Sequence, residues 1–167
     1  MFRRLLGPSI FFCVSSAAGG WLVLNSYSVL DGQLAVIVDK KGNAVDVRAP
    51  GVYTPDWNKK PVIYDVKPQQ YLCSGEEVTG MVAITYRPHP PAVKEIHSAF
   101  GPDYPQKIFP IAGRESLTEV LSAYNGRMKQ DELDKRIGLD LHEKMKPLSI
   151  VILNARVVLP TSLTNST

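Results

Sequence analysis

The sequence has 167 residues, of which 44% are hydrophobic and 21% charged, and a formal net charge of +3. This composition is typical of a globular protein, and the length excludes a large multidomain enzyme. Arg3 and Arg4 precede every acidic residue, whereas acidic and basic side chains are interspersed from Asp31 onward. The sequence therefore lacks the basic face typical of nucleic-acid-binding proteins, and we expect no nucleic-acid partner.

The N-terminal 30 residues contain an uncharged stretch of 26 residues, Leu5 to Leu30. As a helix it would extend about 39 Å, more than the ~30 Å hydrocarbon core of a bilayer. A cleaved signal peptide is one alternative, but apolar residues resume after the small residues 17–19 that would form its cleavage site. A buried core helix is the other alternative, although uncharged helices of this length seldom occur in small domains. We predict a single membrane-spanning helix in contact with the lipid bilayer through Ile10, Phe11, Phe12, Val14, Trp21, Leu22, Val23 and Leu24.

Short apolar runs separated by turns follow this predicted anchor. The runs typical of strands are residues 33–38, 44–48, 61–66 and 78–86, and residues 71–73 begin another; residues 52–55 follow a turn at Pro50 and Gly51. Strands this short and this closely spaced predict an antiparallel sheet or a small barrel.

The hydrophobic period changes after Pro88, where helical spacing replaces alternation. Three segments have the apolar spacing or the bounding residues of helices, namely 91–100, 117–124 and 133–145. Residues 149–159 return to strand composition. We therefore predict an α+β fold in three parts: a membrane anchor, a globular domain and a polar tail (residues 1–30, 31–160 and 161–167).

The sequence contains no pattern typical of an active site or a metal site. His89, His97 and His142 have no cysteine or carboxylate at a ligand spacing, and no glycine-rich phosphate loop or nucleophile elbow occurs. We expect Ser116 at the solvent-facing start of a helix, and both cysteines as small buried hydrophobic side chains. We predict no catalytic residue, no cofactor, no metal ion and no small-molecule substrate.

Two groups of side chains are candidate partner contacts. The aromatic residues Tyr53, Trp57 and Tyr64 lie in a proline-rich stretch, where they either pack against the sheet or contact a membrane surface or a partner. Charged residues of the third predicted helix form either a solvated face or an ionic contact with a partner subunit. These are Asp131, Glu132, Asp134, Lys135 and Arg136.

Several short fragments together resemble a known family. They are QLAVIVD at 33–39, GVYTP at 51–55, KPVIYD at 60–65, VAITYRP at 82–88, GPDY at 101–104, IFPI at 108–111 and the apolar pattern of 117–124. In this order, behind an N-terminal membrane segment, they resemble the prohibitin branch of the SPFH (band 7) family. The resemblance implies an SPFH-like α+β domain.

The sequence departs from the prohibitin pattern in two ways. Prohibitins continue after the last strand into a long coiled-coil helix that drives ring assembly, whereas this sequence ends at Thr167 without a heptad pattern. We therefore expect docking into a host complex rather than self-assembly into a ring. Pro105 and Gly113 replace helix-forming residues of the family pattern, so we expect the helices there to be broken.

The resemblance implies a single-pass protein of the mitochondrial inner membrane with its C-terminal domain in the intermembrane space. The basic, acid-free N-terminus fits mitochondrial import. We predict a non-catalytic scaffold or accessory subunit of a larger membrane complex, such as a respiratory-chain complex or ATP synthase. Three alternatives stay open: a subunit of a ring with full-length prohibitins that acts in membrane organisation and protein quality control, a membrane-tethered enzyme, and a fragment of a longer chain.

Overall fold

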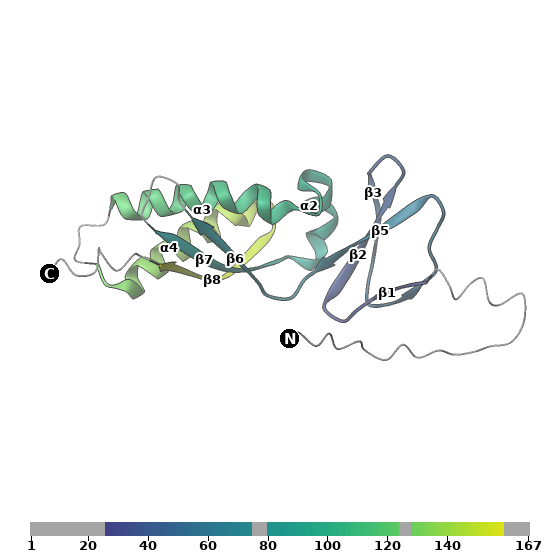
Figure 1. Cartoon of the computed structure of the whole chain (residues 1–167), viewed down its shortest axis with the longest axis horizontal. Coiled ribbons are helices and arrows are strands. Elements are labelled where there is room, and N and C mark those ends of the chain that lie inside the picture. The colour runs from purple at the N-terminus through teal and green to yellow at the C-terminus, as the bar shows by residue number, and fades with distance from the viewer. Residues whose placement is uncertain (1–25, 75–79, 124–127, 159–167) are drawn as a thin grey trace, which may run out of the picture.

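The computed structural model describes residues 26–74, 80–123 and 128–158, which form two lobes along one long axis (Figure 1). The N-terminal lobe is built from five strands, and the C-terminal lobe from three strands and two long helices. The residues predicted to anchor the chain, apart from 26–30, and the tail at 161–167 lie outside the described residues. Within the ranges described, no helix is both long enough and apolar enough to cross a membrane.

The N-terminal lobe surrounds one central strand that is apolar on both faces. Its strands are β1 (Tyr27–Val29), β2 (Gln33–Asp39), β3 (Ala44–Arg48), β4 (Gly51–Tyr53) and β5 (Lys59–Asp65). β2 lies between β3 and β5, and β1 pairs with β4, all antiparallel. Val36 and Val38 of β2 belong to the main core, whereas Ala35 and Ile37 lie in a second apolar cluster with Val29. The uninterrupted apolar run in β2 follows from this burial on two sides.

β1 includes residues that the sequence analysis assigned to the end of the membrane anchor. Tyr27–Val29 pair with β4, and Val29 is buried in the second cluster. The folded domain therefore begins several residues before position 31. The uncharged segment that remains ahead of β1, residues 5–26, would still extend about 33 Å as a helix.

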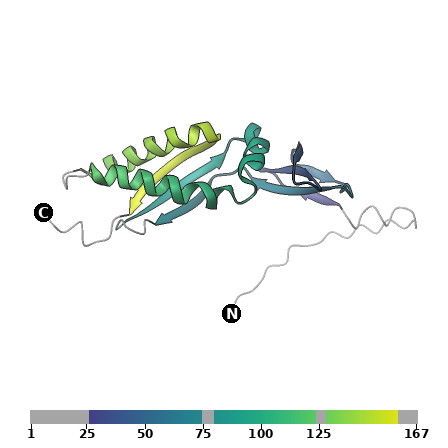
Figure 2. The ribbon, with the colours of Figure 1, turned by 90° about the horizontal axis from the view of Figure 1, so that it is seen from above.

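The C-terminal lobe is an antiparallel sheet with helices on one face. β7 (Met81–Pro88) lies between β6 (Gln69–Ser74) and β8 (Ile150–Val158), and α3 (Tyr104–Ser122) and α4 (Gln130–Met145) run along the strands (Figure 2). The short helix α2 (Val93–Phe100) contacts β2, β3 and α3, and so joins the lobes. Two 3₁₀ turns flank these elements, η1 (Pro90–Ala92) and η2 (Lys146–Leu148). The predicted α+β fold with antiparallel strands is confirmed.

Helix α3 is continuous, so the expected break at Pro105 and Gly113 is wrong. Pro105 occupies the first turn, where a backbone N–H has no partner within the helix. Gly113 faces β6, and a Cβ atom built there would lie 2.9 Å from Sγ of the buried Cys73. The missing side chain therefore allows α3 to approach β6 closely. The expectation that Cys73 is a small buried side chain is confirmed.

Candidate interaction surfaces

The most exposed large apolar side chain described is at the outer end of the N-terminal lobe. Tyr27 lies opposite Tyr53 in the antiparallel β1–β4 pair, so the residues before Tyr27 and after Tyr53 leave this pair at the same end. Trp57 follows in the loop after β4 and is 84% exposed, and Val52 of β4 is 74% exposed. Trp57 is thus available for a contact with another molecule, close to where the chain continues to residue 25. Tryptophan is enriched at protein interfaces and at membrane surfaces.

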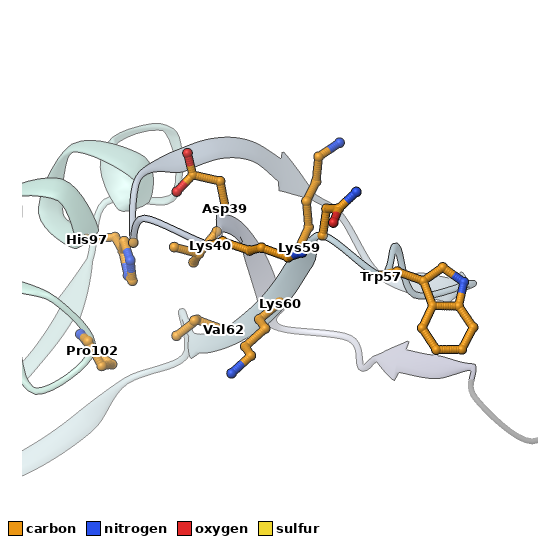
Figure 3. A pocket seen from close by; sticks show the side chains of 11 residues that line it. Asp39, Lys40, Trp57, Lys59, Lys60, Val62, His97 and Pro102 are labelled. Atoms are coloured by element: carbon orange, nitrogen blue, oxygen red, sulfur yellow. The ribbon is translucent and has the colours of Figure 1, made fainter.

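A pocket of about 460 Å³ extends from Trp57 to the connection between α2 and α3 (Figure 3). Val38 and Val62 line it, and His97 and Pro102 lie at the end opposite Trp57. Three lysines also line the pocket, namely Lys40, Lys59 and Lys60.

Two carboxylates, those of Asp39 and Asp56, lie near these lysines. The Lys59 ammonium lies 3.1 Å from the Asp56 carboxylate. Asp39 accepts hydrogen bonds from the backbone amides of Lys41 and Asn43 and from the Asn43 side chain, which together lower the pKa of its carboxyl group. Asp39 therefore stays ionised, and the three lysines exceed the carboxylates of Asp39 and Asp56 by one positive charge.

Tyr53 is a half-buried residue of the second apolar cluster. Its ring lies 5.7 Å from that of Tyr27, and the Arg48 guanidinium lies 4.9 Å from the ring centroid. Its hydroxyl donates a hydrogen bond to the Ala49 carbonyl oxygen at 2.8 Å. These contacts hold β1 and β4 together and leave part of the ring exposed.

Tyr64 lies in the main core, between the lobes. It is 4% exposed, and its hydroxyl is 2.7 Å from Nδ1 of His97 on α2. Burial, with a smaller contribution from Asp103, raises the pKa of Tyr64 to about 12. Burial also lowers the pKa of His97, so this pair joins β5 to α2 in its neutral form. Tyr64 is therefore enclosed in the core and does not form part of an exposed surface that could contact a partner.

The charged residues of α4 divide between two roles. Asp131, Glu132, Lys135 and Arg136 are exposed, and Glu132 pairs with Arg136 at 3.3 Å. Asp134 instead accepts hydrogen bonds from the backbone amide of Val157 and from Gln130, each at 2.8 Å. Gln130 in turn donates to the Val157 carbonyl oxygen at 2.7 Å. Asp134 therefore holds α4 against β8, and the other four residues form an exposed charged face.

Comparison with known proteins gives related matches over most of the chain. Prohibitin-1 of Colletotrichum higginsianum is 25% identical over 162 residues, which cover 89% of this chain and 59% of the relative. Prohibitin 1 of Drosophila melanogaster is 26% identical over 144 residues, which cover 78% of this chain and 52% of the relative. The chain is similar to prohibitins over most of its length. The resemblance inferred from the ordered fragments is thereby confirmed.

A third relative carries a location in its name. Prohibitin-1, mitochondrial, of Arabidopsis thaliana is 34% identical over 76 residues, which cover 41% of this chain and 26% of the relative. No family model matches the chain. The chain spans about half the length of the two relatives that match most of it.

Ser116 lies inside α3 and is fully buried, so its expected place at an exposed helix start is wrong. Three further helical turns precede it, because Pro105 and Gly113 do not interrupt α3. The Lys144 ammonium donates to Oγ of Ser116 at 3.3 Å and pairs with Asp140 at 2.8 Å. The pKa of Lys144 is raised by Asp140 and Glu119 despite its partial burial, so Lys144 stays protonated and is unsuited to act as a base.

Metal-ligating side chains do not gather in the part of the chain that the structure describes. No group of three His, Cys, Asp or Glu residues lies close enough there to hold a metal ion. The absence of catalytic and cofactor sites stays a prediction.

Two structural residues were missed by the sequence analysis. The sequence analysis gives His97 no structural role, although it lies one helical turn after the buried Val93 and thus faces the core. Gln130 was not considered, although it precedes the buried Leu133 by three positions and so lies beside the sheet-facing side of α4. Helical spacing relative to buried positions is the signal that would have identified both.

Proposed function

We propose that this chain is a non-catalytic scaffold or accessory subunit of prohibitin type, anchored in the mitochondrial inner membrane. The observation that carries the proposal is the similarity to Prohibitin-1 over 89% of the chain. The name of the Arabidopsis relative and the basic, acid-free N-terminus support the mitochondrion. The proposed role is to stabilise a larger membrane assembly, by docking into a host complex of the respiratory chain or ATP synthase.

The membrane-bound part of the proposal rests on the uncharged segment 5–26, which directly precedes β1. Arg3 and Arg4 favour an N-terminus on the matrix side and a folded domain in the intermembrane space. In this arrangement Trp57, at the end of the lobe where β1 begins, lies nearest the membrane surface.

The partner-bound part rests on the exposed face of α4. Asp131, Glu132, Lys135 and Arg136 carry charges of both signs on a helix whose opposite side is buried. Such a face suits ionic contacts with another subunit, which set orientation and specificity.

Alkaline carbonate extraction of membranes tests the anchor with the full chain. We expect the chain to stay in the membrane pellet. Val14→Arg with Leu22→Arg should release it, because an arginine at the centre of a spanning helix costs about 3 kcal/mol. Leu72→Arg with Leu139→Arg is the matched control, because both side chains are exposed in the domain. Release of the unchanged chain by carbonate would contradict the anchor.

Native gel separation in mild detergent with mass spectrometry tests the assembly. Migration at fixed stoichiometry with respiratory or ATP-synthase subunits is the expected result, and migration with full-length prohibitins alone would favour the ring. Lys135→Glu with Arg136→Glu should weaken the assembly, whereas Lys146→Glu, on η2, should not. A free monomer would contradict both forms of the proposal.

A further inference from the structure

We propose that the pocket beside Trp57 binds the phosphate group of an anionic phospholipid headgroup, with Lys40 and Lys60 as the residues that contact the phosphate. The inference rests on the proposed membrane function and adds a lipid class to it. The sequence patterns predicted neither lysine as a binding residue.

The charges of the pocket favour an anion. Lys59 and Lys60 project from opposite sides of β5 (Figure 3), as successive residues of a strand do. Lys59 pairs with Asp56 on one side of β5. Lys60 lies on the other side, which Val62 also occupies. Among the described residues, no carboxylate lies within 4.0 Å of the ammonium group of Lys40 or Lys60. With Asp39 counted, these two ammonium groups leave the pocket one positive charge in excess, and neither is held by a carboxylate, so both are available to a phosphate.

The position of the pocket favours a lipid as the source of that phosphate. Trp57 lines the pocket and is 84% exposed, at the end of the lobe where the chain leads to residue 25. An indole in this position enters the interface between headgroups and acyl chains, while nearby lysines contact the headgroups. Val38 and Val62 give the pocket an apolar lining that a free inorganic anion would not require.

The experiment uses the full chain in neutral detergent micelles with a Trp21→Phe substitution, so that Trp57 is the only tryptophan. The fluorescence of Trp57 is followed while short-chain phosphatidylglycerol, short-chain phosphatidylcholine or inorganic phosphate is added. We expect a saturable change with phosphatidylglycerol that weakens with added salt, and none with phosphatidylcholine or phosphate.

Substitution of the two lysines identifies the site. Lys40→Gln and Lys60→Gln should each weaken phosphatidylglycerol binding about fivefold, since each basic residue near an anionic surface contributes about 1 kcal/mol. Lys129→Gln with Lys146→Gln removes two exposed charges from the other lobe and should leave binding unchanged. Far-UV circular dichroism of each variant checks that the fold is intact.

Three results would overturn the inference. The first is an equal response to phosphatidylglycerol and phosphatidylcholine. The second is an equal loss of binding in the Lys40/Lys60 and Lys129/Lys146 variants. The third is saturable binding of inorganic phosphate alone. The last would identify a site for free anions rather than lipid. Carbonate extraction separates this inference from the proposed function, because a chain that resists extraction but shows no lipid preference refutes only the pocket.

Discussion

Replacement of Asp134 by alanine should destabilise the domain, because this carboxylate accepts a hydrogen bond from the backbone at the free edge of β8. β8 is an outer strand of its sheet, and Val157 within it is 2% exposed. Its amide donates to Oδ1 of Asp134 at 2.8 Å, and Gln130 donates to the same oxygen. Removal of the carboxylate leaves a buried backbone N–H without this acceptor.

The expected loss of unfolding free energy is about 2 kcal/mol, since an unsatisfied buried donor costs roughly 1–3 kcal/mol. The Arg156 contact adds little, because the two groups are 3.9 Å apart and Arg156 is 72% exposed. Asp134→Asn keeps an acceptor oxygen and should cost less than Asp134→Ala. Asp131→Ala is the matched control on the same helix, with an expected change within about 0.5 kcal/mol.

Urea unfolding of the full chain in a fixed detergent, followed by far-UV circular dichroism, measures these differences. A native gel of the same variants tests whether Asp134 also contributes to assembly. We expect Asp134→Ala to reduce the assembled fraction only to the extent that its lower free energy of unfolding explains. Equal unfolding free energies for Asp134→Ala and Asp131→Ala would refute the reasoning. Asp134 would then act as a surface charge like its neighbours.

Two further predictions concern the contacts of α3 and α2. Gly113→Ala should destabilise by about 1 kcal/mol in the same unfolding assay, because the overlap with Cys73 costs about 1–3 kcal/mol and the gain in helix propensity offsets about 1 kcal/mol. In a Cys73→Ala background this cost should shrink, and an unchanged cost would show that the close approach is not its cause. Burial lowers the pKa of His97 from 6.5, so the unfolded chain binds the proton at higher pH than the folded chain does. The free energy of unfolding should therefore fall as the pH drops below about 6.5. His97→Gln should flatten this dependence between pH 7.5 and 5.5, and parallel profiles for the two proteins would contradict it.

Strands with clear local signals could be predicted from the sequence. The predicted run at 44–48 coincides with β3, and the run at 33–38 differs from β2 by one residue. β1 was missed because Tyr27–Val29 belong to an uncharged apolar stretch, and only their pairing with β4 makes them a strand. Pairing between residues more than 20 positions apart leaves no local signal.

The first turns of α3 were missed because proline and glycine were interpreted as breaks. Pro105 is tolerated in the first turn, and Gly113 is required by the distance to Cys73, which only the packed structure reveals. Among the candidate contacts, Trp57 and Tyr64 are both aromatic residues of one segment, yet one is exposed and the other enclosed. Tyr64 is enclosed because His97 of α2 and Tyr104 of α3 pack against it, contacts between distant segments that composition does not encode.

The pairing of β1 with β4 fixes the direction in which the chain joins the domain. Ser26 is followed at once by a hydrogen-bonded strand, so no free linker lies between residue 26 and the sheet. If the proposed membrane anchor extends to residue 26, a tilt of that anchor would be transmitted directly to β1 and would turn the N-terminal lobe with it. A flexible linker inserted between residues 26 and 27 would uncouple the two movements.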